Sequence, residues 1–169
     1  MIQNNEALLA RLRQNGVQFV VIGGVCSVYY GVPIATFDLD ICCQLGEANL
    51  RRIEAAVRDL HPIHRLAANK LPLELTSELC LRLKNLHLQT DLGILDCLGE
   101  VAGVGGYEEV YRQSVTGELL SGKSQFLTMD ALIAAKQAVG RPRDLETLKH
   151  LYAIKEKLAH PTPPPKPKD

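Results

Sequence analysis

The chain has 169 residues, with 19 lysines and arginines against 19 aspartates and glutamates, so its formal net charge is zero. This length can bury the core of one domain. The neutral balance excludes the strong basic field that draws proteins to nucleic acids or anionic membranes. No apolar run approaches the roughly 18 residues that span a bilayer, and the N-terminal stretch has no secretion-signal pattern. We therefore expect a soluble, cytoplasmic protein that does not enter a membrane.

The five cysteines indicate the same compartment. Their number is odd, they lie mostly in apolar runs, and no CxxC spacing suggests a zinc site or a redox pair. Reduced, buried thiols are the expected state of this set, which comprises Cys26, Cys42, Cys43, Cys80 and Cys97.

The first sixty residues alternate between helical and strand patterns. Leu8, Leu9 and Leu12 recur at helical spacing, and β-branched and aromatic residues before Gly23-Gly24 are typical of a buried strand. In chain order we expect a helix over 5–15, a strand over 17–22, a short helix that Gly31 ends, a strand over 35–44 and an amphipathic helix over 47–60. The segment 61–80 shows no clear periodicity.

The second half begins with leucines that alternate with polar residues. Leu81, Leu83, Leu86 and Leu88 predict a strand that turns near Asp91-Leu92-Gly93 and returns, giving a hairpin over 81–100. Beyond it we expect a helical turn in "YEEVYRQS", a smaller hairpin from "GELLSG" and "SQFLT", a helix over 129–140 after a Thr128 cap, a helix over 143–158 and a polyproline-like tail.

This order of elements predicts an α+β fold, in which a mixed sheet is flanked by helices and followed by C-terminal helices. We expect a single domain over residues 1–160, with a core over 17–100 and a C-terminal helical part over 107–158. The Pro-rich tail over 161–169 is expected to form neither helix nor sheet.

Two aspartates lie one residue apart in the strand expected over 35–44. Because residues i and i+2 of a strand share a face, Asp38 and Asp40 can direct their carboxylates at one point, where they repel unless a cation lies between them. Asp96 in "ILDCL" is a third carboxylate on an apolar strand. Such oxygen ligands suit Mg²⁺, and three carboxylates on adjacent strands could hold two ions that activate a hydroxyl and neutralise a leaving phosphate.

Gly23 and Gly24 form a second feature, between a predicted strand and a predicted helix. Glycines there let backbone N–H groups approach an anion closely, and a helix N-terminus favours negative charge. The pattern is neither a P-loop nor the GxGxxG fingerprint. A phosphate-binding turn beside a carboxylate–metal cluster is what nucleotidyl transfer requires.

The glycine pair, "TFDLDI" and the later aspartate together resemble the nucleotidyltransferase fold shared by DNA polymerase β, the minimal nucleotidyltransferases and the antibiotic nucleotidyltransferases. The C-terminal "DALIAAKQAVGRPRDLETLKHL" is similar to the helix and basic turn of a bacterial subgroup that includes toxins of toxin–antitoxin and phage-defence systems. Residues 17–151 carry the resemblance.

The resemblance implies roles for the residues that match the family's motifs. The ligands of two Mg²⁺ ions would be Asp38, Asp40 and Asp96, and Asp96 would also take the proton from the acceptor hydroxyl. The residues at the nucleotide would be Gly23, Gly24, Thr36, Lys136, Arg141 and Arg143. The last three would either bind the triphosphate or hold the C-terminal helices against the core. The family commonly has an arginine two residues before the threonine, and this chain has Ile34 there.

Each feature also has a purely structural explanation. An Asp-x-Asp pair can be a solvated strand edge, and a glycine pair can permit a tight turn. Asp91, in the expected hairpin turn, is a turn former and the second choice for the third carboxylate. Lys136 can be a solvated charge. "GRPRD" can be a helix break, with Gly140 ending one helix and Pro142 starting the next.

The sequence thus predicts a Mg²⁺-dependent nucleotidyltransferase that moves a nucleoside monophosphate from an NTP such as ATP to a hydroxyl and releases pyrophosphate. The acceptor stays open between a small molecule such as an antibiotic, an RNA end such as that of tRNA, and a protein side chain. One rival is a catalytically silent module of the same fold that binds nucleotide or protein, motivated by Ile34. Another is a partner-dependent protein whose tail or sheet edge docks an antitoxin-like chain.

Overall fold

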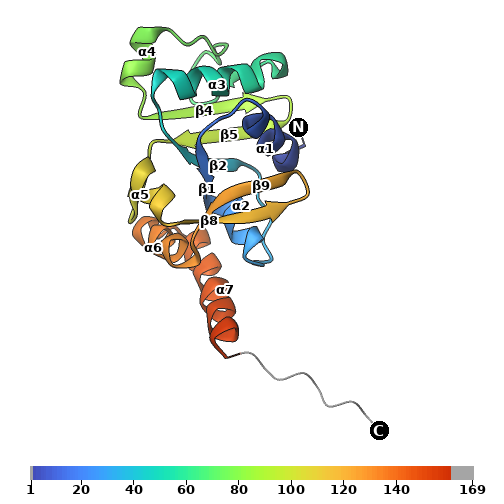
Figure 1. Ribbon diagram of the computed structural model, residues 1–169, viewed down its shortest axis with the longest axis vertical. Helices are drawn as coiled ribbons and strands as arrows, with labels where there is room; N and C mark the ends of the chain where they lie inside the picture. Colours follow the sequence, from blue (N-terminus) through green and yellow to red (C-terminus); the bar gives the residue numbers. More distant parts are fainter. Residues whose placement is uncertain (1, 161–169) are drawn as a thin grey trace.

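The computed structural model of the protein describes residues 2–160 (Figure 1). Its helices are α1 (Asn5–Gln14), α2 (Gly23–Tyr29), α3 (Glu47–Val57), the 3-10 turn η1 (Arg58–Leu60), α4 (Ser77–Arg82), α5 (Tyr107–Arg112), α6 (Met129–Val139) and α7 (Pro142–Ala159). Its strands are β1 (Phe19–Val21), β2 (Leu39–Cys43), β3 (Ile63–His64), β4 (Asn85–Thr90), β5 (Gly93–Leu98), β6 (Glu100–Val101), β7 (Gly105–Gly106), β8 (Ser114–Leu119) and β9 (Gly122–Leu127). The predicted α+β class with C-terminal helices is confirmed.

The main sheet has seven strands in the order β3-β4-β5-β2-β1-β9-β8. Most neighbours are antiparallel, but β2 runs parallel to β5 and β1 runs parallel to β9. Both predicted hairpins are present, as β4–β5 and β8–β9, and the second extends the main sheet. A separate antiparallel pair joins β6 to β7. The fold thereby brings β2 and β5, which are far apart in the sequence, side by side in the middle of the sheet.

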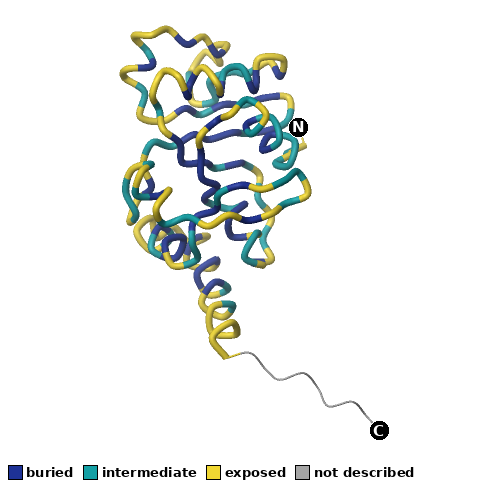
Figure 2. The backbone as a smooth tube through the Cα atoms, viewed as in Figure 1, coloured by how far each residue is buried: buried dark blue, intermediate teal, exposed yellow. Residues whose placement is uncertain are grey.

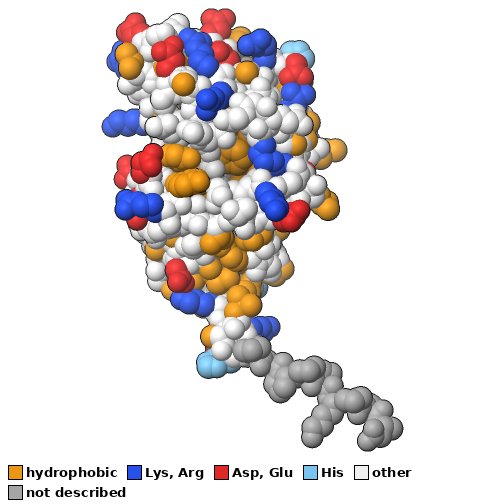
Figure 3. Space-filling model, viewed as in Figure 1, with side chains coloured by type: hydrophobic (Ala, Val, Ile, Leu, Met, Phe, Trp, Pro, Cys, Tyr) orange, Lys and Arg blue, Asp and Glu red, His pale blue; other side chains and the backbone are white. Residues whose placement is uncertain are grey.

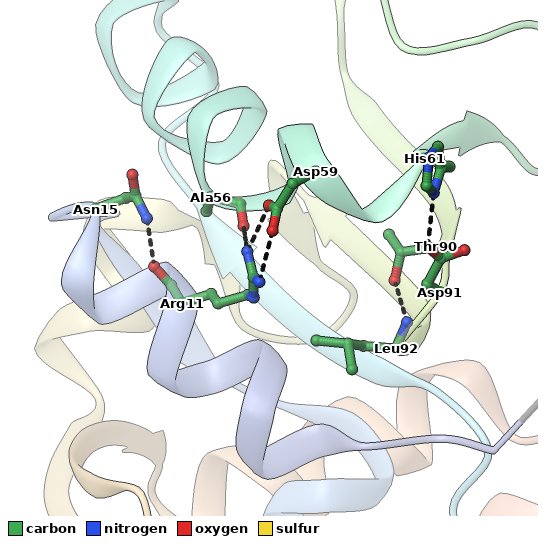
Figure 4. A network of polar contacts seen from close by, with 8 residues as sticks. All are labelled: Arg11, Asn15, Ala56, Asp59, His61, Thr90, Asp91 and Leu92. Carbon is green, nitrogen blue, oxygen red and sulfur yellow. Dashed lines mark hydrogen bonds and ion pairs between the residues drawn. The ribbon is translucent and has the colours of Figure 1, made fainter.

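The first helix begins after Asn4, which caps it. The Asn4 side chain accepts a hydrogen bond from the Ala7 N–H at 3.0 Å, and the three leucines of α1 are fully buried. α1 packs beside α3. Arg11 joins α1 to η1, at the end of α3, through two hydrogen bonds to Asp59 at 2.6 and 2.8 Å (Figure 4). This surface pair links α1 to η1.

The hydrophobic core follows the central strands, which are among the most buried parts of the chain (Figure 2). Every residue of β1 is buried, and in β2 only Asp40 is not. All five cysteines are free and buried, as predicted. Asp40 is therefore a partly buried acid in the middle of an otherwise apolar strand.

Two predicted strands differ from the structure. The strand expected to begin at Leu81 is wrong in its first residues, because Leu81 lies in α4 and is 86% exposed. The Thr76 side chain accepts a hydrogen bond from the Leu79 N–H at 3.1 Å and caps that helix. The strand expected over 35–44 is shorter, because its ladders with β1 and β5 begin no earlier than Leu39. Asp38 therefore lies just before β2 and not within it.

The surface agrees with the neutral composition. Figure 3 shows lysines and arginines scattered among acids over one face of the molecule, without a field of a single sign. Within residues 2–160, no helix is both long and apolar enough to cross a membrane. The predicted Pro-rich tail, 161–169, lies outside the described residues.

Candidate functional site

Three aspartates come together at the middle of the sheet. Asp40 in β2 and Asp96 in β5 are partners in the parallel register, and Asp38 immediately precedes β2. One carboxylate oxygen from each of the three lies within 4.8 Å of the others. We call these residues the acidic cluster. Asp91 is not part of it, because it lies in the β4–β5 turn and pairs with His61 at 2.7 Å (Figure 4).

The acidic cluster concentrates negative charge where water has little access. Asp96 is only 7% exposed. Burial is the main reason that the pKa of Asp40 rises from 3.8 to about 6. The charges of Asp38 and Asp96 act in the same direction, and two nearby cations oppose the rise. A further cation bound among the three carboxylates would relieve this repulsion.

Gly23 and Gly24 lie against the acidic cluster at the start of α2. Gly23 has a φ of +62°, and a Cβ at this position would collide with Asp40 Oδ2. A Cβ at Gly24 would lie 2.6 Å from Thr36 Oγ1, and this hydroxyl in turn donates to the Asp38 carbonyl at 3.0 Å. Only glycine allows the backbone to pass so close to the carboxylates.

Lys136 and Arg141 are held by an acid that the sequence analysis does not single out. Asp144, in the first turn of α7, is 3% exposed. It accepts hydrogen bonds from Lys136 Nζ at 3.0 Å and from Arg141 Nε at 2.7 Å. Burial alone would raise the pKa of Asp144, but these two partners hold it below its ordinary value. These contacts join α6 to α7. The two roles predicted for the cations, at the triphosphate or between the C-terminal helices and the core, stay predictions.

Arg143 connects α7 to the irregular segment that carries Asp38. Its guanidinium donates to the Ala35 carbonyl and lies 6.0 Å from the centre of the Phe37 ring. Because both contacts are neutral, they leave the positive charge of Arg143 uncompensated.

Two side chains that the sequence analysis misses lie against Asp96. Arg65 Nη2 donates to Asp96 Oδ2 at 2.5 Å. His87 Nδ1 lies 3.0 Å from Asp96 Oδ1, within ion-pair distance, but the two atoms do not form a hydrogen bond. Within residues 2–160, Asp96 Oδ1, His87 Nδ1 and Arg65 Nε are therefore buried without a hydrogen-bond partner.

The two missed residues differ in how well the sequence could reveal them. A two-residue turn at Asp91-Leu92 fixes the β4–β5 register and makes His87 the partner of Asp96, so counting back from the turn would have found it. Arg65 follows β3 in the segment without periodicity, and no pattern there points to it. Asp144 gives only the weak signal of an acid in the first turn of a helix.

One cavity of about 630 Å³ brings these groups together, and every predicted site residue lines it. Arg65 and Asp144 line it as well, and Ile34 forms part of its apolar wall. This volume lies within the range of roughly 300–1,000 Å³ that is usual for small-molecule sites.

The acidic cluster has the chemistry of a site for a hard divalent cation. Carboxylate oxygens are the ligands that Mg²⁺ prefers in proteins, and the three here are close enough to share an ion. Asp96 Oδ1 is buried, lies 3.0 Å from His87 Nδ1 and accepts no hydrogen bond from a described residue. The residues present therefore fit Mg²⁺, with Asp38, Asp40 and Asp96 as its candidate ligands.

No protein-family model matches the chain, and no curated protein matches it. Among solved structures, it is similar to a Thermotoga maritima protein assigned as a nucleotidyltransferase, with 19% identity over 86% of this chain and 88% of the other, and a TM-score of 0.54. It is also similar to ANT(2'')-Ia in complex with adenylyl-2''-tobramycin, with 12% identity over 90% and 92% of the two chains, and a TM-score of 0.52. The chain therefore has the nucleotidyltransferase fold that its motifs predict.

Proposed function

We propose that the protein is a Mg²⁺-dependent nucleotidyltransferase that moves a nucleoside monophosphate from an NTP to a hydroxyl group. The observation that carries this proposal is the meeting of three carboxylates and a glycine turn in one cavity. Such transfer requires little covalent chemistry from the protein, because positioning and charge stabilisation supply most of the catalysis. Both are functions that these residues can perform.

In this proposal each group has a defined task. Asp38, Asp40 and Asp96 hold Mg²⁺, which when bound supplies neutralisation of the phosphate charge. The backbone at Gly23 and Gly24 receives the phosphates. The acceptor oxygen attacks the α-phosphorus, the bond to the β-phosphate oxygen breaks, and pyrophosphate leaves. The Asp96 carboxylate takes the proton of the acceptor hydroxyl.

We propose a small hydroxylated molecule as the acceptor. The cavity has the volume of a small-molecule site, and the neutral composition provides no long-range attraction for RNA. The complex of ANT(2'')-Ia contains an adenylylated tobramycin. Aminoglycosides are therefore the first acceptors to test.

The test is incubation of the purified protein with Mg²⁺, each labelled NTP and, in separate tubes, a panel of aminoglycosides, total RNA and a cell extract. We expect pyrophosphate release together with label on a small molecule. Asp38→Ala should abolish both, whereas Asp91→Ala, which removes a carboxylate outside the acidic cluster, should leave both unchanged. Full activity in Asp38→Ala would refute the assignment. Binding of Mg²⁺ and NTP without transfer in any tube would favour the catalytically silent module. Ile34, which lines the cavity where the family commonly has an arginine, is the observation that supports this alternative.

A further inference from the structure

Arg65 forms an incomplete ion pair in the cavity. It donates one hydrogen bond to Asp96, through Nη2, while its buried Nε has no acceptor among the described residues. The second oxygen of Asp96 lies 3.0 Å from His87 Nδ1 but accepts no hydrogen bond from a described residue. A guanidinium and a carboxylate can form two parallel hydrogen bonds, so this pair uses only part of what each partner offers. The Arg65 side chain is 30% exposed and lines the cavity.

The other cations of the cavity have different partners. Lys136 and Arg141 share the carboxylate of Asp144, and Arg143 is bonded to a backbone carbonyl. Arg65 differs from all of these because its acid partner is itself a proposed metal ligand. Its charge also interacts with Asp38 and Asp40, which together with the Asp96 hydrogen bond raises the pKa of its guanidinium.

A metal ion and Arg65 would act on the same carboxylate of Asp96. Arg65 holds its Oδ2, and an ion bound by all three aspartates would place a second positive charge beside the guanidinium and draw on the same negative charge, which weakens the bond to Nη2. A released guanidinium has a second suitable partner, because phosphate and carboxylate present similar pairs of oxygens to its planar fork. The NTP phosphates would enter this same cavity.

On the basis of the proposed function, we propose that Arg65 is an exchangeable cation of the site. It pairs with Asp96 when the acidic cluster holds no metal, and it moves to the phosphates of the NTP when Mg²⁺ takes that carboxylate. The exchange couples the two ligands, since Arg65 opposes binding of the metal alone and favours binding of the metal with its nucleotide.

Calorimetry with two probes tests this exchange without knowledge of the base or the acceptor. The probes are MgCl₂ alone and inorganic tripolyphosphate with Mg²⁺. In Arg65→Gln we expect Mg²⁺ alone to bind about tenfold more tightly, because a competing charge is gone. We expect tripolyphosphate with Mg²⁺ to bind about tenfold more weakly, because the phosphates lose a guanidinium. Arginine with a purely structural role would change both affinities in the same direction or neither.

Arg51→Gln is the matched control, because Arg51 forms ion pairs with Glu47 and Glu54 on α3 and does not line the cavity. It should change neither affinity. If Arg65→Gln does not fold, Arg65→Lys replaces it in the test. Lysine keeps the positive charge but lacks the planar guanidinium that forms two parallel hydrogen bonds. We therefore expect this variant to bind tripolyphosphate more weakly and Mg²⁺ with unchanged affinity. Parallel changes, or none, in a folded Arg65 variant would overturn the exchange and leave the proposed function standing. A wild-type protein that binds neither probe would overturn both.

Discussion

Two arginine–aspartate pairs in this molecule are built in opposite ways. Arg11 meets Asp59 at the surface through two hydrogen bonds and also donates to the Ala56 carbonyl at 3.3 Å (Figure 4). Arg65 meets Asp96 in the cavity through one hydrogen bond, and each partner keeps a buried atom that makes no hydrogen bond with the described residues. The surface pair is bidentate and links α1 to η1. The cavity pair has a single hydrogen bond and lies next to other carboxylates, so it is suited to exchange one partner for another.

The largest expected effect is at Asp40, the register partner of Asp96. Asp40→Asn removes a proposed metal ligand, and we expect transfer to fall by roughly a thousandfold or more. The same change should raise the free energy of unfolding at pH 7 by on the order of 2 kcal/mol, because the folded state no longer carries a charge that burial and two like charges oppose. Activity assays and urea unfolding measure the two effects.

The pH dependence follows from the sign of the Asp40 shift. Its pKa is raised to about 6 from 3.8, so the folded state binds this proton more tightly than the unfolded chain does. The resulting stabilisation is fully present below pH 3.8 and is lost as the pH rises through about 6. Asp40→Asn should remove this component, whereas Asp59→Asn should neither remove it nor impair transfer. If Asp40→Asn were less stable than wild type at pH 7, the charge of Asp40 would not destabilise the folded state, and this prediction would be wrong.

The next largest effect is expected at Gly23, where backbone strain can be separated from contact with the acidic cluster. Gly23 and Gly16 have nearly equal positive φ values, +62° and +66°, but only at Gly23 would a Cβ meet another group, the Asp40 carboxylate. Alanine at either position should cost about 1 kcal/mol of stability for the left-handed backbone. Only Gly23→Ala should also reduce transfer, by about a hundredfold, because it displaces Asp40. Equal activities of the two variants would show that the close approach is not needed.

A further prediction concerns the buried ion pair of Lys136 and Asp144. Asp144→Asn leaves Lys136, whose side chain is 11% exposed, without its acid, and we expect a loss of about 3 kcal/mol in urea unfolding. The lowered pKa of Asp144 means that its contribution is present at neutral pH and is lost as the pH falls below about 3.8. Glu146→Gln, which breaks an exposed pair with Lys149, should have little effect on stability. Similar losses in the two variants would show that Asp144 does not anchor the C-terminal helices.

The smallest effect is expected at the surface pair of Arg11 and Asp59. Arg11→Gln removes two hydrogen bonds to an exposed acid, and exposed pairs contribute little because water and salt screen them. The urea midpoint should fall slightly, with a dependence on ionic strength, and transfer should stay within about twofold of wild type. A clear loss of activity would mean that this pair acts on the site and not only on helix packing.

Local patterns in the sequence predict much of the fold. The leucines of α1, the turn at Asp91-Leu92 and the Thr128 cap each mark an element that the structure contains. The acidic residues of β2 and β5 could be recognised because charged side chains are conspicuous in apolar runs. What the sequence does not show is strand order, since nothing local states that β2 pairs with β5.

The missed parts of the site depend on long-range contacts. Arg65 meets Asp96 only because β3 and β4 carry it to that side of the sheet, and its own segment has no periodicity to interpret. The roles of Lys136 and Arg141 stay open from sequence because a helix-break motif and a phosphate-binding motif use the same residues. Their shared contact with buried Asp144 emerges only when α6 packs on α7.

The parallel pairing of Asp40 with Asp96 also has a consequence for folding kinetics. The β4–β5 hairpin and the β1–β2 pair are each formed by segments close in the chain, whereas the β2–β5 ladder joins them and must close a long loop first. The acidic cluster is absent from any intermediate that lacks this ladder. A ligand that needs all three carboxylates therefore binds only states that contain this ladder, and it stabilises them over the unfolded chain by mass action. Metal binding during refolding would report the moment at which the two halves of the sheet join.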